Sequence, residues 1–125
     1  MSWTVLYDDD FFREFEALES DVQTEIVAMA GLLETYGPAL GRPHADTLAG
    51  SKHANMKELR FKAVDGVWRV AFAFDPVRRA VLLVAGDKSG VAQKRFYSAL
   101  LRKADTRFST HLKTLKEAED GSHAS

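Results

Sequence analysis

Residues 67–74, VWRVAFAF, carry the pattern that most restricts how this chain can fold. Large apolar side chains occupy every second position, namely Trp68, Val70, Phe72 and Phe74. Arg69, Ala71 and Ala73 lie between them. Because successive side chains of a β-strand point to opposite faces, such a strand must bury its large apolar face against another layer. We expect the face that carries Arg69 to be open.

Two further segments with strand-like patterns flank this one, residues 56–63 and 80–87. Asp65-Gly66 is typical of a hairpin turn, and Asp75-Pro76 begins the second turn. These three segments predict an antiparallel meander. Residues 3–7, WTVLY, are rich in β-forming residues and predict a fourth strand at the start of the chain.

Helical periodicity predicts three helices. Apolar residues recur at helical spacing from Asp9 to Leu18, and again from Ser20 to the Gly37-Pro38 pair. The last helix is predicted from about Val91, with an i, i+4 apolar stripe that consists of Phe96, Leu100, Ala104, Phe108, Leu112 and Leu115. Residues 37–55 have little periodicity and predict one long loop.

The predicted order is therefore β-α-α-β-β-β-α, an α+β fold. A helical hairpin and a C-terminal helix would pack on a mainly antiparallel, four-stranded sheet. We expect a single domain over residues 1–116 and a flexible C-terminal tail over residues 117–125.

The net charge of −1 conceals a segregation of charge along the chain. Residues 1–50 contain two Arg against ten acidic residues, whereas residues 51–116 contain fifteen Lys and Arg against five acidic residues. A basic surface that binds a polyanion would explain this asymmetry. A fold that pairs acidic helices with a basic sheet would give the same counts.

The composition also excludes several kinds of site. With no cysteine, the chain has no disulfide, no thiolate nucleophile and no cysteine-bound metal. The four histidines lack the compact spacing of a metal site, so we expect neither a metal nor another cofactor. No apolar run approaches the about 20 residues that span a bilayer, and we expect a cytoplasmic protein.

Strand parity brings several candidate functional residues together. If residues 56–63 and 67–74 pair as a hairpin, Arg60 and Arg69 share the open face of the sheet with Glu58 and Lys62. Two neighbouring arginines suit bidentate contacts to a phosphate. Alternatively, both arginines pair with Glu58 and cover a solvated face.

Further candidates follow the last predicted strand or lie in the predicted loop. Lys88 ends the strand, and Tyr97 lies in the first turns of the last helix, either as a proton donor or acceptor or as a boundary aromatic with its hydroxyl in water. Lys52 and His53 could close over a bound strand from the loop. The expected RNA-binding residues are Lys52, His53, Lys62, Lys94 and Arg95.

A set of Arg, Lys and Tyr side chains without a metal fits one type of reaction well. In metal-independent RNA cleavage the 2′-hydroxyl attacks the adjacent phosphate. The enzyme then needs a base for that hydroxyl, an acid for the leaving 5′-oxygen and cations for the developing charge.

The chain resembles a known family, the phage-derived, HigB-like branch of the RelE/ParE toxin superfamily. The similarity extends over roughly residues 3–116 and is carried by the predicted element order and by four segments. These are GRPHADTLAGSKHANMKELRF, WRVAFAF, VLLVAGDKSG and KRFY. The resemblance implies a RelE-like fold and a cytoplasmic toxin of a type II toxin-antitoxin module that cleaves mRNA on the ribosome. It also implies a cognate antitoxin, usually of the helix-turn-helix type.

The same resemblance implies roles for individual residues. Arg60 and Arg69 match the sheet arginines that stabilise the scissile phosphate, Lys88 matches the basic position after the last strand, and Tyr97 resembles the aromatic hydroxyl of the last helix. Asp87 stands where many relatives have a second lysine, and it would weaken a phosphate site unless it faces away. The general base remains open between Glu58, Tyr97 and Lys57, of which Lys57 has the wrong strand parity.

Two other functions are compatible with the same sequence. One is a ParE-like inhibitor of DNA gyrase that has no nuclease centre, because the superfamily reuses this scaffold without catalysis. The other is a non-catalytic relative that only binds nucleic acid or an antitoxin.

Overall fold

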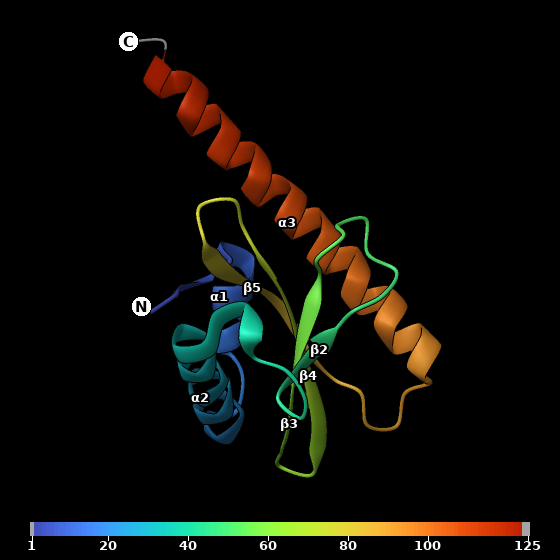
Figure 1. The fold of residues 1–125 in the computed structure, drawn as a ribbon. Coiled ribbons are helices and arrows are strands. Elements are labelled where there is room, and N and C mark those ends of the chain that lie inside the picture. Colours follow the sequence, from blue (N-terminus) through green and yellow to red (C-terminus); the bar gives the residue numbers. More distant parts are fainter. Residues whose placement is uncertain (1, 124–125) are drawn as a thin grey trace.

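The computed structural model describes residues 2–123, which form a three-layer α+β domain (Figure 1). The helices are α1 (Asp9–Glu16), α2 (Ser20–Tyr36) and α3 (Gln93–His123), with a short 3-10 helix at Gly37–Ala39. The strands are β1 (Thr4–Tyr7), β2 (Ala45–Thr47), β3 (Lys57–Ala63), β4 (Gly66–Phe74) and β5 (Arg79–Asp87). The predicted α+β class and element order are confirmed, with one additional strand.

The five strands form one mixed sheet in the order β1-β5-β4-β3-β2. The predicted meander is present, because β3 pairs with β4 and β4 with β5, each antiparallel. β1 pairs with β5 in parallel at one edge of the sheet. In the β3–β4 register Arg60 lies directly opposite Arg69, as the strand parity predicted.

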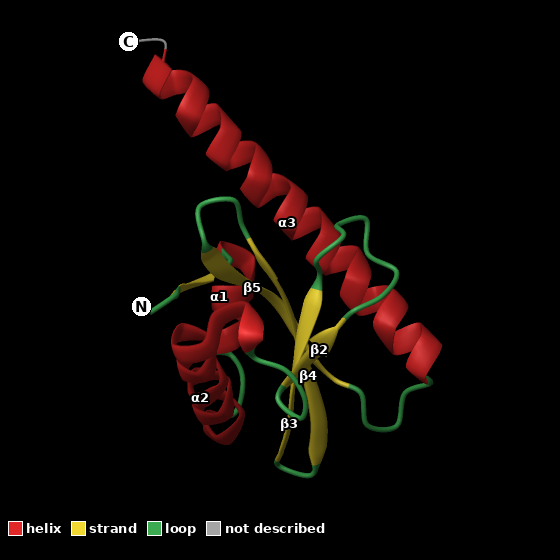
Figure 2. Ribbon diagram, viewed as in Figure 1, coloured by secondary structure: helices red, strands yellow, loops and turns green. Residues whose placement is uncertain are grey.

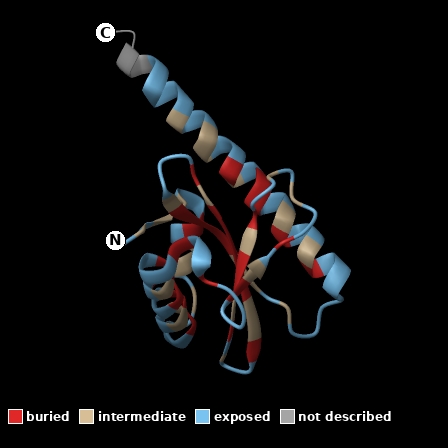
Figure 3. Cartoon of the chain, viewed as in Figure 1, coloured by how far each residue is buried: buried red, intermediate tan, exposed pale blue. Residues whose placement is uncertain are grey.

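Helices cover both faces of the sheet (Figure 2). The first core lies between the sheet and α1 and α2, and it contains Phe11, Ile26, Leu33, Phe72 and Leu82. The second core lies under α3, where Phe96, Leu100, Ala104 and Phe108 pack on Ala71 and Ala73. Buried residues therefore line both sides of the strands (Figure 3).

The prediction that the Arg69 face of β4 is open is wrong. Ala71 and Ala73 are fully buried under α3, and Arg69 itself is only 5% exposed. Small side chains at these positions make room for a helix rather than for a phosphate. The helix also approaches β5 closely at Gly86, where an added Cβ would lie 2.9 Å from the Phe96 ring.

The predicted loop over residues 37–55 contains a short edge strand. β2 is only three residues long and pairs antiparallel with β3, with Asp46 opposite Glu58. Three residues are too few to show an alternating pattern in the sequence. The four-stranded sheet that was predicted thus gains a fifth strand, which forms the edge nearest to the candidate site.

α3 is longer than the sequence indicated. Its stripe of apolar residues ends near Leu115, yet the helix continues to His123 and so includes most of the segment that was predicted as a tail. At about 1.5 Å per residue, the 31 residues of α3 extend its C-terminal part beyond the sheet (Figure 1). Flexibility of residues 117–125 in solution stays a prediction, and residues 124–125 lie outside the described residues.

Two polar side chains of α3, Arg107 and His111, fix the helix across the layers. Arg107 donates to both carboxylate oxygens of Glu14 in α1, at 2.8 and 2.7 Å, and to the backbone oxygen of Leu83 at 2.8 Å. His111 contacts the fully buried carboxylate of Asp75 at 2.8 Å. In the part of the chain that the structure describes, no helix is both long enough and apolar enough to cross a membrane.

Candidate functional site

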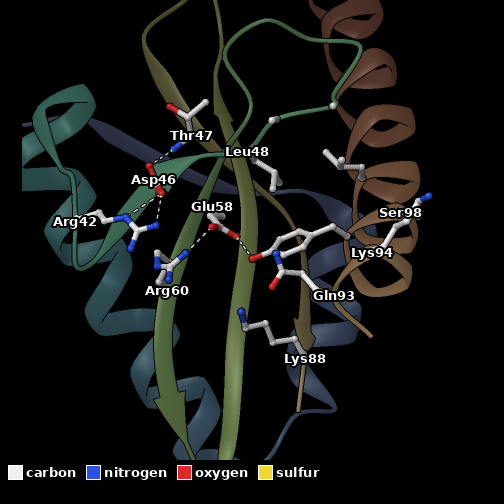
Figure 4. Close-up of a pocket in the computed structure, with 14 residues that line it drawn as sticks. Arg42, Asp46, Thr47, Leu48, Glu58, Arg60, Lys88, Gln93, Lys94 and Ser98 are labelled. Atoms are coloured by element: carbon white, nitrogen blue, oxygen red, sulfur yellow. Dashed lines mark hydrogen bonds and ion pairs between the residues drawn. The ribbon is translucent and has the colours of Figure 1, made fainter. Parts of the chain in front are cut away.

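An open cleft of about 870 Å³ lies between the edge strand β2 with its neighbour β3 and the first turns of α3 (Figure 4). Its lining comes from β2 and the segments beside it, from β3, from the end of β5 and from α3. The lining residues are Arg42, Asp46, Thr47, Leu48, Ala49, Gly50, Glu58, Arg60, Lys88, Gln93, Lys94, Tyr97, Ser98 and Leu101.

Glu58 is the centre of the polar network in this cleft, although its side chain is only 5% exposed. Arg60 donates from Nη1 to Oε2 of Glu58 at 2.8 Å, and the Tyr97 hydroxyl donates to Oε1 at 2.8 Å. Arg69 lies on the other side, with its Nε 3.7 Å from Oε1. The carboxylate thus separates two arginines that face each other across β3 and β4, where like charges would otherwise repel.

Arg69 is bonded within the protein through Nε and Nη1. Its Nε donates to the Tyr97 hydroxyl at 3.3 Å, and its Nη1 donates to the backbone oxygen of Trp68 at 2.9 Å. The side chain is 7% exposed, compared with 22% for Arg60. Arg60 is therefore the arginine that a ligand in the cleft can reach, while Arg69 orients Tyr97 and Glu58 from beneath.

Tyr97 reaches the network because α3 begins at Gln93 and places it one position beyond Phe96, which packs in the second core. Burial raises the pKa of Tyr97, the hydrogen bond to the Glu58 carboxylate raises it further, and Arg69 opposes both effects. A raised pKa keeps the phenol protonated at neutral pH. Tyr97 accordingly serves as a hydrogen-bond donor to the Glu58 carboxylate.

Lys88 extends from the end of β5 toward the same cluster (Figure 4). Its ammonium lies 6.0 Å from the centroid of the Tyr97 ring. Burial and the positive charges of Arg69 and Arg60 lower the pKa of Lys88, against the opposing effect of Glu58. A lysine with a lowered pKa releases its proton more readily than a free lysine does, which suits general acid catalysis.

Asp87 and Lys57 both point away from the cleft. Asp87 accepts hydrogen bonds from the backbone amides of Val67 and Ser89, at 3.0 and 2.9 Å, and lies beside Trp68 on the side of α1 and α2. Lys57 donates to the backbone oxygen of Pro38 at 3.5 Å. Asp87 therefore does not oppose a phosphate in the cleft, and Lys57 is no candidate for the base.

The structure brings together only part of the predicted site. Glu58, Arg60, Lys88, Tyr97 and Lys94 line the cleft, and Arg69 lies beneath it. Lys62 has the same strand parity as Arg60 but is exposed outside the lining, as is Arg95 on α3. Both arginines do lie beside Glu58, as the alternative states, but Glu58 and Arg69 are buried and Arg60 lines the cleft, so the group does not cover a solvated face.

Lys52 and His53 lie away from the cleft, where they connect the segment after β2 to the middle of α3. The Lys52 amide donates to Oδ2 of Asp105 at 3.1 Å, and His53 Nε2 lies 2.9 Å from the Ser109 hydroxyl. The His53 ring also packs edge-on against Phe108, at 5.0 Å between centroids. Lys52 and His53 therefore help to attach the segment after β2 to α3. The sequence does not indicate this role, because the partners lie over fifty positions away in the chain.

Other lining residues were not anticipated from the sequence. Arg42 and Asp46 form an ion pair of 2.8 Å at the rim formed by β2, and Gln93 and Ser98 face the cleft from α3. Arg42 and Asp46 lie in the segment that was predicted as a loop. Gln93 and Ser98 lie in the predicted helix, and Ser98 follows Tyr97 directly, but nothing in their local sequence marks them.

Comparison with known proteins places the chain in a family. A family model described as phage derived protein Gp49-like matches residues 13–109. The chain belongs to this family. Two relatives from Mycobacterium tuberculosis (strain ATCC 25618 / H37Rv) are similar in sequence: "Putative toxin HigB2", 39% identical over 103 residues, and "Putative toxin HigB3", 44% identical over 95 residues.

The matches cover most of this chain but not all of each relative. The similarity to HigB2 covers 82% of this chain and 51% of HigB2, so the chain spans about half the length of that relative. The similarity to HigB3 covers 76% of this chain and 81% of HigB3. The inferred resemblance to the HigB-like branch is confirmed by the family match and by both relatives.

Solved structures confirm the RelE-like fold. A mutant of the E. coli toxin RelE in the free state superposes with a TM-score of 0.55 at 13% identity, over 82% of this chain and 97% of that one. The isolated E. coli RelE toxin, P21 form, gives a TM-score of 0.52 at 13% identity, over 81% of this chain and 97% of that one. At this identity the likeness describes the fold alone.

Proposed function

We propose that this protein is the cytoplasmic toxin of a type II toxin-antitoxin module and that it cleaves mRNA on the ribosome without a metal ion. The observation that carries this proposal is the network in the cleft, where one buried carboxylate, one accessible arginine, a protonated tyrosine and a lysine of lowered pKa converge. Membership of the HigB-like branch supports the toxin role.

In the proposed reaction Arg60 binds the scissile phosphate. Its guanidinium pairs with Glu58 in the structure, and a phosphate oxygen can take the place of that carboxylate. The change of partner frees Oε2 of Glu58, which then accepts the proton of the attacking 2′-hydroxyl. Glu58 is thus the proposed general base.

The leaving group needs a proton at the other side of the phosphate. Lys88 is the proposed donor to the 5′-oxygen, because its lowered pKa makes the ammonium a stronger acid. The P–O5′ bond breaks as the 2′-oxygen bonds to phosphorus, which leaves a cyclic phosphate and a 5′-hydroxyl. Tyr97 and Arg69 hold the Glu58 carboxylate in position during these transfers.

The experiment that tests this function is primer extension on a defined mRNA in a purified translation system, with and without ribosomes. Arg60→Ala should reduce the rate of cleavage by about 100-fold, as expected when a preorganised cation is removed from a developing negative charge. Lys62→Ala is the matched control, since it removes a cation of the same strand and parity from outside the cleft. Arg69→Ala is less informative because the loss of a buried arginine disturbs folding.

The nuclease would be contradicted if the folded wild-type protein left the mRNA intact both in the presence and in the absence of ribosomes. Equal loss of activity in Arg60→Ala and Lys62→Ala would argue against the cleft as its location.

A second function is favoured by one observation. Arg69, the second arginine expected at the phosphate, is only 7% exposed and bonds to the Tyr97 hydroxyl and the Trp68 carbonyl, which leaves the cleft one cation fewer for a scissile phosphate. The alternative is a ParE-like inhibitor of DNA gyrase. A supercoiling assay separates the two, since this inhibitor would block supercoiling by purified gyrase and leave mRNA intact.

The proposed partners are the ribosome with its mRNA and a cognate antitoxin, which in HigB-type modules usually carries a helix-turn-helix domain. The basic residues Arg42, Lys88 and Lys94 at the cleft support an anionic substrate. An acidic antitoxin segment would compete for the same cations.

A further inference from the structure

The cleft contains two arginines that each have a carboxylate of their own. Arg60 pairs with Glu58, and Arg42 contacts Oδ2 of Asp46 through Nε and Nη2, at 3.0 and 2.8 Å. Asp46 lies opposite Glu58 in the register of β2 and β3. Figure 4 shows the two pairs next to each other at the β2 side of the cleft. Both acids thus occupy positions that a phosphate of RNA could take.

We propose that Arg42 is the second arginine of the phosphate site and that Asp46 competes with RNA for it. Arg42 takes the role that the sequence assigned to Arg69, whose side chain is only 7% exposed. The inference deepens the proposed function, since it rests on RNA as the substrate. It assigns a substrate contact to a residue just before β2 and a competing role to a residue of that strand.

Exposure makes the pair of Arg42 and Asp46 easy to exchange. Their side chains are 66% and 36% exposed, whereas those of Arg69 and Glu58 are 7% and 5% exposed. An exposed ion pair contributes little to stability, because water solvates both charges when the pair opens. A buried pair that loses one partner leaves a charge without compensation. A phosphate can therefore recruit Arg42 at little cost, but it cannot recruit Arg69 in this way.

Asp46 keeps a partner when Arg42 leaves. Its Oδ1 accepts a hydrogen bond from the Thr47 amide at 2.9 Å, so the carboxylate does not depend on the arginine alone. This amide is the largest cause of the lowered pKa of Asp46, and the hydrogen bond and charge of Arg42 and the charge of Arg60 lower it further. The carboxylate therefore stays ionised at neutral pH, where it holds Arg42 until a phosphate replaces it.

Backbone hydrogen bonds fix the turn that carries Arg42 to the strand that carries Arg60. The Arg60 amide donates to the carbonyl oxygen of His44, two positions after Arg42, at 2.8 Å. The amides of His44 and Ala45 both donate to the Gly41 carbonyl at 3.0 Å, which closes the turn. The two arginines are thus presented to the cleft from connected parts of the backbone, without the entropic cost of ordering a loop.

A binding experiment on the full chain tests this role without relying on cleavage. Fluorescence anisotropy would measure the affinity for a single-stranded RNA oligonucleotide over a range of salt concentrations. Arg42→Ala should weaken binding about tenfold, as the loss of a charge-assisted contact to phosphate predicts, and should reduce the slope of log K against log salt by about 0.7. Asp46→Asn should instead tighten binding about threefold, because RNA no longer has to displace an exposed ion pair.

A double variant separates competition for Arg42 from general electrostatics. Removal of any acid near the cleft favours RNA, but competition requires the arginine to be present. Asp46→Asn should therefore give no further gain in affinity in the background of Arg42→Ala. The ion pair of Arg13 and Asp10 on α1 is the matched control, since its side chains are 69% and 58% exposed and lie outside the cleft. Arg13→Ala and Asp10→Asn should leave the affinity unchanged.

The outcomes separate the role of Arg42 from the nuclease. No measurable binding of RNA by the wild-type protein, or equal losses in Arg42→Ala and Arg13→Ala, would overturn this role, as would an affinity that Arg42→Ala leaves unchanged. Cleavage of mRNA by the same preparation would then leave the nuclease standing. A gain from Asp46→Asn that persists in the absence of Arg42 would overturn the competition. The expected pattern of affinities would establish both roles even if mRNA stayed intact, in which case only the nuclease would be overturned.

Discussion

At the scale of single residues, the site depends on one carboxylate that has three partners. Glu58 is buried, and burial of a carboxylate is tolerated only when charged or hydrogen-bonding groups surround it. Arg60, Arg69 and Tyr97 meet that requirement. Burial, followed by the charges of Arg69 and Arg60, lowers the pKa of Lys88, and burial together with the hydrogen bond to Glu58 raises that of Tyr97.

The titration of Lys88 is a direct test of this coupling. Arg60→Ala removes one of the positive charges that lower the pKa of Lys88, so this pKa should move upward toward the ordinary range. The measurement is the pH dependence of the lysine side-chain ¹³C resonances by NMR. Arg102→Ala, an exposed arginine on α3 outside the cleft, should leave the titration as it is.

The sign of the corresponding activity change follows from the proposed role of Lys88. If its ammonium protonates the 5′-oxygen, cleavage falls as the pH rises through the pKa of Lys88. Because that pKa is lowered, the decline begins at a lower pH than a free lysine would give. A wild-type Lys88 that titrates within or above the usual lysine range would contradict both statements.

At the scale of elements, α3 closes one face of the sheet and positions half of the site. Its apolar stripe packs on small residues of β4, and Tyr97 follows the stripe by one position. The segment between β2 and β3 is fixed to the helix through Asp105, Ser51 and His53. The width of the cleft therefore depends on contacts just outside it, since Ser51 follows the lining residue Gly50.

Asp105→Ala should release that segment. The change leaves the Ser51 hydroxyl and the Lys52 amide without their acceptor, and we expect a loss of about 1–3 kcal/mol in the free energy of unfolding. Urea denaturation measures the loss, and hydrogen exchange at the Lys52 amide reports the local release. Thr106→Ala is the control, because its hydroxyl donates to the Arg102 carbonyl of the same helix at an exposed position. Unchanged protection of the Lys52 amide in Asp105→Ala would contradict the assigned anchor.

At the scale of the whole molecule, the charge segregation becomes a segregation of layers. The acidic residues of the first fifty positions lie largely on α1 and α2, on one face of the sheet, and the cleft lies on the other side with α3. Arg107 links the layers through Glu14 and Asp8. Ion pairs between the layers thus account for part of the sequence asymmetry, and binding of a polyanion in the cleft stays a prediction.

The layered charge predicts how RNA binding responds to salt. Lys94 lines the cleft and the adjacent Arg95 does not, so Lys94→Ala should weaken binding of a single-stranded RNA oligonucleotide while Arg95→Ala should not. Loss of one phosphate contact should reduce the slope of log K against log salt by about 0.7. Fluorescence anisotropy over a range of salt concentrations measures both quantities. The same loss in both variants would indicate a diffuse basic surface instead of a cleft.

Much of the fold could be predicted because it depends on local patterns. The alternation in β4 and the two turns specify the meander, and they also specify that Arg60 lies opposite Arg69. Helical periodicity located α1, α2 and the start of α3. β2 could not be predicted, because three residues carry no period and pair only because β3 offers a free edge.

The sequence by itself determined which residues share a face of the sheet, because side-chain direction in a strand follows from parity alone. Only the tertiary structure decided what covers that face. Both faces of the sheet carry apolar or small residues, so each can accept a helix. The face that α3 covers depends on how well the shapes fit, with Phe96 against Gly86 and the helix against Ala71 and Ala73. That packing buried Arg69, left Arg60 accessible, moved Lys52 and His53 out of the site and brought Gln93 and Ser98 into it. Such contacts join residues far apart in the chain, and no local pattern records them.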